Sequence, residues 1–284
     1  MLRRRPTDNG NPAAAADALF ERVLVGIDST DESLVAAAQA GVLRAPGGRL
    51  VLLGVVERHL AAQAGLFAAQ AADELVTGTS TELERARELV DADEAILATG
   101  SFVSHLCAEC ERGRATLVAV GVRPHRRLSA LTFGGHDVEA LHDLSCSVLI
   151  ARPGWGPARP DRVVVGVDAS REARRAEVVA RSLARRLGCE VVPVVPLGAD
   201  VDLAVLHEER EDALLHPGSL LDGVVSAATS RSLIVVGESP EQGRRWGGGL
   251  AERVVYAARC SVLVVDYDAD VAGGDAEPAA AGDG

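Results

Sequence analysis

The chain has 284 residues, with 29 basic and 41 acidic side chains and a formal net charge of −12 at pH 7. Every basic residue is arginine, which excludes the lysine-dependent chemistry of P-loops, protein kinases and Schiff-base enzymes. The length suggests two domains, and the negative charge argues against a general binder of nucleic acids or anionic membranes.

No segment has the pattern of a targeting signal or a membrane span. Arg3 to Arg5 resemble the charged start of a signal peptide, but the residues up to Pro12 are polar where an apolar stretch should follow. No apolar run approaches the roughly 20 residues of a membrane helix. The five cysteines, an odd number, indicate reduced thiols. We therefore expect a cytoplasmic protein that does not bind membranes.

The first half of the chain alternates predicted strands with predicted helices. An apolar run without polar alternation predicts a buried strand at 22–28, and Ser29 to Glu32 predict the start of a helix that ends near Leu43. The elements expected next are strands at 50–56, 94–99, 116–120 and 147–151, and helices at 80–91, 101–112 and 136–144. Strands separated by helices imply a parallel sheet with helices on both faces.

The second half repeats the first. The segment 22–30, RVLVGIDST, recurs as 162–170, RVVVGVDAS, and 146–150, CSVLI, recurs as 260–264, CSVLV. The elements expected in the second copy are strands at 162–168, 190–195, 201–206, 232–236 and 261–265, and helices at 171–187, 218–229 and 249–258. Pro196 to Asp200 leave no room for a helix after the second strand. These matches predict one domain that has been duplicated, with a shorter second copy.

The duplication divides the chain into five expected segments. These are a disordered tail at 1–20, a first domain at 21–152, a linker at 153–160, a second domain at 161–267 and a disordered acidic tail at 268–284. The tails combine low hydrophobicity with Ala, Gly and Pro, and the linker is rich in Pro and Gly.

Two features meet at the carboxyl edge of each predicted sheet, where open parallel sheets bind ligands. A carboxylate, Asp28 or Asp168, ends the first strand of each copy. A glycine, Gly121 or Gly237, ends the fourth strand, and a loop with paired arginines and a glycine pair follows before the next predicted helix. Glycines and a helix N-terminus favour phosphate binding, but the same pattern also describes two ordinary surface loops.

The order and duplication of these markers resemble the universal stress protein family in its tandem form. The markers are the first-strand Asp with Ser or Thr two residues later, the Val-Gly that ends the fourth strand, and the Cys-Ser-Val-Leu before the fifth. The resemblance covers about 22–152 and 162–266. It implies an α/β protein with two tandem flavodoxin-like domains, each a five-stranded parallel sheet with helices on both faces. The two domains would pack as an internal pseudo-dimer through their fifth strands, and a homodimer of the whole chain is also compatible.

Many members of that family bind ATP through a G-x2-G-x9-G-[S/T] motif after strand four, which this chain matches only in part. In the first copy Gly121 and Gly134 match, whereas Pro124 replaces the second glycine and Gly135 replaces the Ser or Thr. In the second copy Pro240 replaces the second glycine, and proline offers no N–H to a phosphate. The resemblance implies these candidate nucleotide-binding residues: Asp28, Val55, Gly121, Arg123, Gly134, Gly135, His136, Asp168, Gly237, Gly248 and Gly249.

The resemblance further implies a stress-response protein that binds ATP, with Mg accompanying the nucleotide, and acts on an unidentified protein partner without catalysis. A nucleotide-free scaffold or partner-recognition protein is the alternative. A slow ATP hydrolase is a third reading, which lacks a visible general base or metal ligand set. No separate metal site and no nucleic-acid site are expected.

The cysteines suggest a second candidate site. Cys107 and Cys110 form a lone C-x-x-C within a predicted helix, which favours buried or half-buried thiols over a metal or redox motif. Cys146 and Cys260 occupy equivalent positions before strand five, and Cys189 precedes strand two. Small core residues would explain all three.

Overall fold

The computed structural model describes residues 19–28, 30–57, 68–124, 131–133, 136–137, 141, 144–168, 170–197, 212–238 and 249–266. Both predicted tails lie outside the described residues, except Leu19 and Phe20. Phe20 is buried and Leu19 packs against the same apolar cluster.

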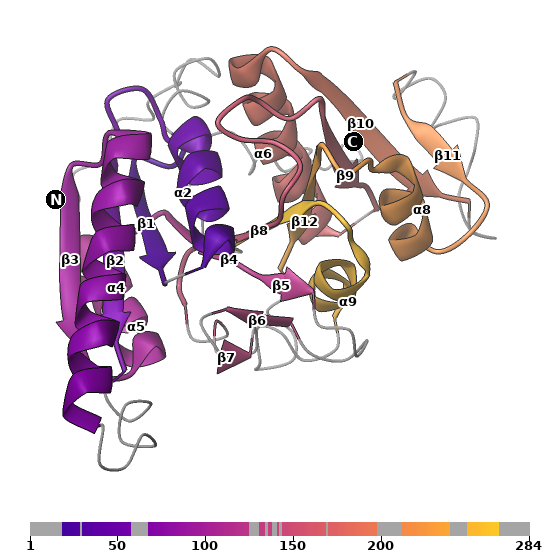
Figure 1. The fold of residues 1–284 in the computed structure, drawn as a ribbon. Helices are drawn as coiled ribbons and strands as arrows, with labels where there is room; N and C mark the ends of the chain where they lie inside the picture. The colour runs from indigo at the N-terminus through magenta and orange to yellow at the C-terminus, as the bar shows by residue number, and fades with distance from the viewer. Residues whose placement is uncertain are drawn as a thin grey trace, which may run out of the picture.

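Ten strands form a single sheet in the order β11-β10-β9-β12-β13-β8-β4-β1-β2-β3 (Figure 1). The first half contributes β1 (Arg22–Ile27), β2 (Arg49–Val56), β3 (Glu94–Thr99), β4 (Leu117–Gly121) and β8 (Ser147–Ala151). The second half contributes β9 (Arg162–Gly166), β10 (Glu190–Pro196), β11 (Leu214–His216), β12 (Ser232–Gly237) and β13 (Ser261–Val265). Each half is parallel throughout and orders its strands 3-2-1-4-5 along the chain. The predicted doubly wound α/β class is therefore confirmed, although flavodoxin itself has the order 2-1-3-4-5.

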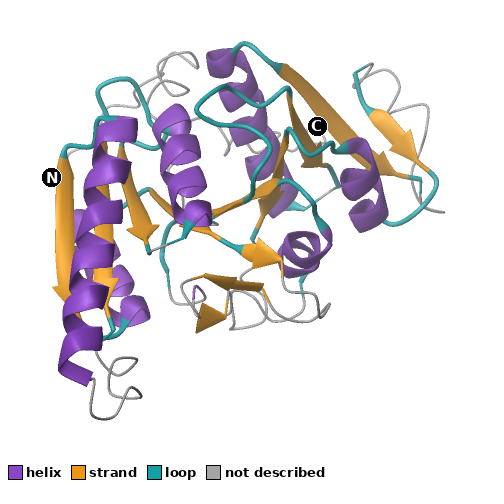
Figure 2. Ribbon diagram, in the orientation of Figure 1, coloured by secondary structure: helices purple, strands orange, loops and turns teal. Residues whose placement is uncertain are grey.

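Helices cover both faces of the sheet (Figure 2). One face packs against α2 (Asp31–Leu43), α4 (Ala68–Val90) and α6 (Arg171–Leu187). The other packs against α5 (Phe102–Gly113), α8 (Leu220–Ala227) and α9 (Leu250–Ala257). Because the central strands lie between two helical layers, every residue of β4, β8 and β13 is buried, as their unbroken apolar runs predict.

The strand register is the same in the two halves. Val23 lies opposite Leu117 in the first half, and Val163 lies opposite Leu233 in the second. The next pair of strands agrees as well, with Leu117 opposite Ser147 and Leu233 opposite Ser261. This agreement follows the alignment of the repeats residue by residue.

The two halves join through their fifth strands, as predicted. β8 and β13 pair antiparallel, with Ile150 opposite Val262 and Val148 opposite Val264. The pairing removes one edge from each half-sheet, and exposed edges are where sheets aggregate. The internal pseudo-dimer is thus built on one continuous sheet.

Two predicted elements are wrong and one is too short. The predicted helix at 136–144 does not begin at His136, because His136–Asp137 is the short strand β7. The third strand of the second half is β11 rather than the predicted 201–206, which lies outside the described residues. The predicted helix at 80–91 begins earlier, at Ala68.

Candidate functional site

The strand order of the first half reverses between β1 and β4, which makes the carboxyl ends of these strands the expected place for a ligand. From β1 the chain builds outward to β2 and β3, and then returns to place β4 and β8 on the other side. Asp28 follows β1 and Val122 follows β4. The carboxyl ends of these two strands are therefore the candidate site.

Asp28 is half-buried and held by the turn that leads into α2. Its Oδ1 accepts a hydrogen bond from the Thr30 N–H at 3.0 Å and a second, very short one from the Thr30 hydroxyl. Thr30 then caps α2, because its side chain accepts the Ser33 N–H. Among the described residues no donor reaches Asp28 Oδ2. One carboxylate oxygen therefore orients the turn and the other remains available to a ligand.

Gly121 is needed at the end of β4 by a contact that the sequence alone does not show. A Cβ atom at this position would lie 2.0 Å from the carbonyl oxygen of Glu32 and 2.7 Å from the Ser33 N atom, in the first turn of α2. Gly237 has the same contact in the second half, where a Cβ would lie 2.2 Å from the Glu172 carbonyl oxygen. Both glycines thus have a packing role whether or not a ligand binds.

The segment after β4 forms a small sheet instead of leading into a helix. β5 (Arg123–Pro124), β6 (Leu131–Phe133) and β7 (His136–Asp137) pair antiparallel in that order. Phe133 lies opposite His136, so Gly134 and Gly135, which lie outside the described residues, separate two paired strands. The predicted helix start directly after this glycine pair is therefore wrong for the first half. The backbones of Arg123 and His136 are described, but their side chains are not.

A comparison with known proteins identifies the first half. Residues 19–152 match the sequence profile of the universal stress protein family. This part of the chain is a universal stress protein domain. No curated protein matches the sequence of the chain.

Solved structures share the fold over both halves. A universal stress protein from Archaeoglobus fulgidus DSM 4304 has a TM-score of 0.63 at 17% identity, covering 87% of this chain and 98% of that one. A putative universal stress protein from Pseudomonas aeruginosa UCBPP-PA14 has a TM-score of 0.61 at 18% identity, covering 89% and 95%. At these identities the likeness shows the fold alone.

The universal stress domain places Val55 at the same edge as Asp28. Val55 is the second-last residue of β2 and is largely buried. The equivalent residues Arg22 and Arg162 lie opposite Arg49 and Glu190, which are therefore equivalent positions in β2 and β10. Val55 and Pro196 lie the same number of residues further along these strands, so Pro196 is the counterpart of Val55.

Glu57, which sequence reasoning missed, is a buried carboxylate at this edge of the universal stress domain. It directly follows β2, and its Oε1 accepts the Phe102 N–H at 2.9 Å at the start of α5. Gly26 in β1 makes room for Phe102, because a Cβ there would lie 2.5 Å from the tip of the Phe102 ring. The sequence places a carboxylate directly after a predicted strand here, as it does at Asp28, and this pattern could have identified Glu57.

The second half differs from the universal stress domain at the corresponding strand ends. The Asp168 Oδ1 again accepts an N–H two residues on, that of Ser170 at 2.8 Å, but Asp168 is exposed. Glu238 is buried where the first half has Val122, and both donate their N–H to the fifth strand. Gly249 does cap a helix, α9, as predicted, whereas Gly248 lies outside the described residues.

A polar network at the junction of the halves was also missed. Gln39 of α2 is fully buried and donates its Nε2 to the carbonyl oxygens of Arg152 and Trp155 at 2.8 and 2.9 Å. Its Oε1 accepts the Ser261 hydroxyl of β13 at 2.7 Å. Arg152 is itself buried and donates to the carbonyl oxygens of Cys260 and Val255 of the second half.

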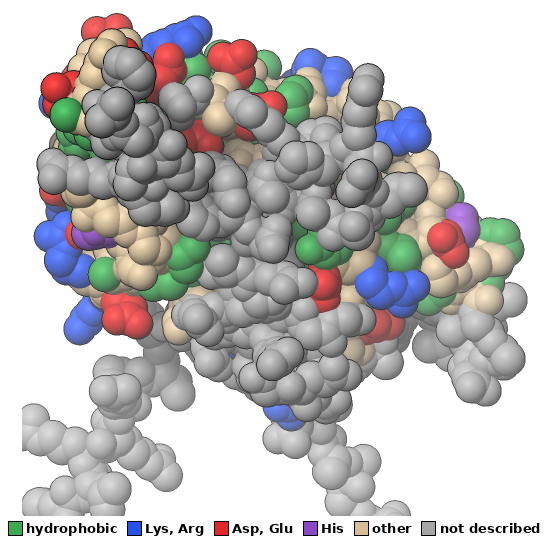
Figure 3. Space-filling view, turned by 60° about the horizontal axis from the view of Figure 1, so that its bottom comes forward, with side chains coloured by type: hydrophobic (Ala, Val, Ile, Leu, Met, Phe, Trp, Pro, Cys, Tyr) green, Lys and Arg blue, Asp and Glu red, His purple; other side chains and the backbone are tan. Residues whose placement is uncertain are grey.

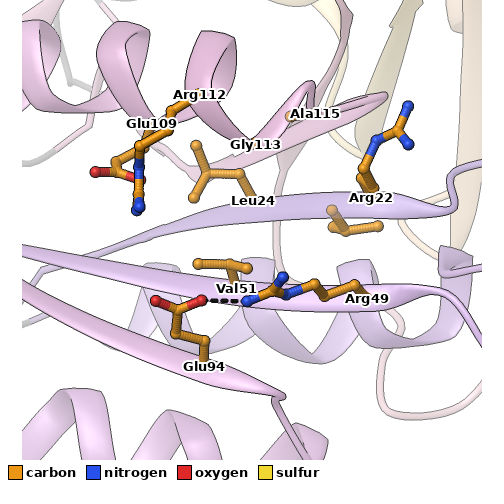
Figure 4. A pocket seen from close by; sticks show the side chains of 10 residues that line it. Arg22, Leu24, Arg49, Val51, Glu94, Glu109, Arg112, Gly113 and Ala115 are labelled. Atoms are coloured by element: carbon orange, nitrogen blue, oxygen red, sulfur yellow. Dashed lines mark hydrogen bonds and ion pairs between the residues drawn. The ribbon is translucent and has the colours of Figure 1, made fainter.

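A pocket of about 170 Å³ lies at the opposite, amino edge of the universal stress domain (Figure 4). Arg49 of β2 and Glu94 of β3 form an ion pair across its mouth, and α5 closes it from above with a second pair, Arg112 and Glu109. The pocket is therefore separate from the candidate site at Asp28. These two ion pairs hold two of its three arginines, and the third, Arg22, donates to the carbonyl oxygen of Arg114 at 2.6 Å.

Other site classes have no support in the described part of the chain. It contains no group of three or more His, Cys, Asp or Glu side chains that could hold a metal ion. None of the helices in it is long and apolar enough to cross a membrane. On the face in Figure 3, acidic and basic side chains are interspersed rather than gathered by sign.

Proposed function

We propose that the chain binds one adenine nucleotide, ATP, at the carboxyl ends of β1 and β4 of the first half, and acts by binding rather than catalysis. The observation that carries the proposal is the position of Asp28 at the point where the strand order reverses. Its unsatisfied Oδ2 suits a ribose hydroxyl, which donates a hydrogen bond to a carboxylate. The match of residues 19–152 to the universal stress protein family supports the same ligand class.

The residues that would hold the nucleotide come from three strand ends. Val55 would contribute an apolar surface to the adenine, and Asp28 would bind the ribose. The phosphates would depend on the backbone N–H groups around Gly134 and Gly135 and on the charge of Arg123, because β7 rather than a helix follows this glycine pair. Mg²⁺ would arrive with the nucleotide.

We propose that the second half belongs to the same family but does not bind nucleotide. Its strand register and its Asp168 turn repeat those of the first half. However, the buried Glu238 stands where the apolar Val122 stands in the first half, and Asp168 is exposed whereas Asp28 is half-buried. The second half would serve to complete the sheet through β13 and to present a partner-binding surface.

A nucleotide-free scaffold remains the second candidate, and specific observations favour it. Pro124 cannot donate to a phosphate, and Gly121 is fully explained by its contact with Glu32. In this case the cytoplasmic protein would act through its partner surfaces alone.

Mass spectrometry of the protein purified without added nucleotide distinguishes the two candidates. We expect ATP or a related adenine nucleotide to be released in about one equivalent, and added ATP to raise the Tm. An isosteric Asp28→Asn change should weaken ATP binding by about tenfold, and so reduce both the nucleotide content and the ATP-induced rise in Tm, while its turn to Thr30 is retained.

Asp168→Asn is the matched control, because it alters the equivalent turn of the half that we propose to be empty. It should leave nucleotide content unchanged. Absence of nucleotide together with no thermal shift at millimolar ATP would reject the proposal in favour of the scaffold. Equal losses in both variants would reject the single-site version.

A further inference from the structure

Two buried cysteine side chains touch in the first half. Cys110 lies in the last turn of α5 and Cys146 directly precedes β8. Their Sγ atoms are 3.4 Å apart, and each residue is only 5% exposed. They are 36 positions apart in the sequence, so the fold rather than the local chain brings them together.

The surrounding backbone fixes this approach. The Ala115 N–H donates to the Cys110 carbonyl oxygen at 2.9 Å, which ends α5 and directs the chain into β4. β4 then pairs with β8, with Leu117 opposite Ser147, the residue after Cys146. Both thiols therefore lie in the same apolar cluster at the amino edge of adjacent strands.

We propose that Cys110 and Cys146 are a reversible disulfide site that a small peroxide oxidises. A disulfide bond is about 2.05 Å long, so the sulfurs must close by only about 1.4 Å, which side-chain rotation and a small shift of the α5 end can supply. A small oxidant suits the site because glutathione disulfide would have to enter a buried cluster.

Hydrogen peroxide can act as the two-electron oxidant that converts the two thiols to a disulfide. One thiolate attacks a peroxide oxygen, the O–O bond breaks, and the products are a sulfenic acid and hydroxide. The second thiol sulfur then displaces the sulfenic oxygen, and the S–S bond forms as water leaves. Overall, two thiols and one peroxide yield one disulfide and two waters, and a dithiol reductant reverses the oxidation of the protein.

The second half supplies an internal control. Cys260 is the counterpart of Cys146 and is equally buried. The helix caps Ser101 and Ser219 align α5 with α8, which places Ala228 at the position of Cys110. Cys260 therefore has no second cysteine at the place where Cys110 meets Cys146. Cys260 should therefore remain reduced while the pair oxidises.

The disulfide would enclose β4 and the following segment with β5 to β7. If the proposed nucleotide site holds, this ring includes the residues expected to contact phosphate, so oxidation would restrain that loop. That consequence rests on the proposed function, whereas the disulfide itself does not.

Peptide mapping of the full chain tests the proposal directly. After limited hydrogen peroxide and blocking of free thiols, we expect a peptide pair that joins Cys110 to Cys146 and separates with dithiothreitol. The wild-type protein should lose two of its five free thiols. Cys110→Ala and Cys146→Ala should each abolish the loss, whereas Cys107→Ser, which removes the half-buried thiol on the same helix, should still lose two.

Several results would overturn the inference. One is a wild-type protein that keeps all five thiols at peroxide levels that oxidise a free cysteine peptide. Another is a linkage that uses Cys107 or joins two chains. The wild-type map suffices even where an alanine variant fails to fold, and it is independent of whether nucleotide binds.

Discussion

Replacing Gly121 with alanine is expected to destabilise the protein by about 3 kcal/mol or more. The added Cβ would lie 2.0 Å from the Glu32 carbonyl oxygen and 2.2 Å from its carbonyl carbon, well inside any contact distance. Both partners are backbone, one in buried β4 and one in the first turn of α2, so no side chain can rotate away. Relief requires α2 to move off the sheet, and with it the turn that holds Asp28.

Chemical denaturation of the variant measures this loss, and two glycines elsewhere supply controls. Gly237→Ala should cost a similar amount, because its Cβ would lie 2.2 Å from the Glu172 carbonyl oxygen. Gly78→Ala, inside α4 with open space around it, should instead stabilise by about 0.5–1 kcal/mol through helix propensity. A Gly121→Ala protein as stable as the wild type would show that α2 does not pack on β4 as described.

Gly121 has two possible explanations, one in ligand binding and one in packing. A nucleotide-binding motif and a tight helix–strand contact both require glycine at the end of strand four. The presence of glycine in the sequence therefore does not distinguish a binding role from a packing role. A Gly121→Val test of ligand binding would disrupt the fold as well. Asp28→Asn is the sharper test because it leaves the packing untouched.

The fold was predictable because its strands are buried on both faces. A run such as RVVVG at 162–166 has no polar alternation, so it favours a central parallel strand wherever it lies. The resemblance to the universal stress proteins implied the join through the fifth strands, and the structure adds that they pair antiparallel. Edge elements were harder: β11 has three residues, two of them exposed, and its leucines have no distinctive pattern.

The segment after β4 shows why local periodicity failed. Leu141 and Leu144 have helical spacing and are both buried, and the Leu144 N–H donates to the Leu141 carbonyl oxygen at 3.2 Å. The glycine pair between Phe133 and His136 is also the typical signal of a two-residue hairpin. The prediction placed the same pair at the opening of a helix, where the structure has the strand β7.

The junction between the halves was beyond sequence reasoning for a different reason. Gln39 and Ser261 are 222 positions apart, and neither has a counterpart that reveals a partner. The position of Arg152 in the repeat corresponds to Asp266, so the two side chains carry opposite charges, although the backbone contacts are symmetric: Ser261 accepts the Arg152 N–H at 3.0 Å and Ser147 accepts the Asp266 N–H at 3.3 Å. Only the assembled sheet shows that these polar groups satisfy one another.

Replacing Arg152 with alanine is expected to cost about 3 kcal/mol. The guanidinium is buried and donates to the carbonyl oxygens of Val255 at 2.6 Å and Cys260 at 3.2 Å, in the last turn of α9 and just before β13. Its removal leaves two buried acceptors without these donors and opens a cavity between the halves. Burial lowers the pKa of Arg152 to about 10, so the guanidinium remains charged at neutral pH. Its positive charge lies at the C-terminal end of α9, where the helix dipole is negative, and this interaction is stabilising.

Arg152→Lys separates charge from geometry at this site. An ammonium group keeps the charge, but it cannot span both carbonyl oxygens with a planar fork, so we expect about half of the alanine loss. Arg162→Ala is the matched control, because Arg162 forms an exposed ion pair with Glu190 and should cost less than about 1 kcal/mol. Calorimetry should show the two halves of the wild type unfolding together, since Arg152 and Gln39 tie β8 and α2 to β13. An Arg152→Ala protein with unchanged stability would mean that strand pairing alone holds the halves together and that the buried arginine contributes no net stabilisation.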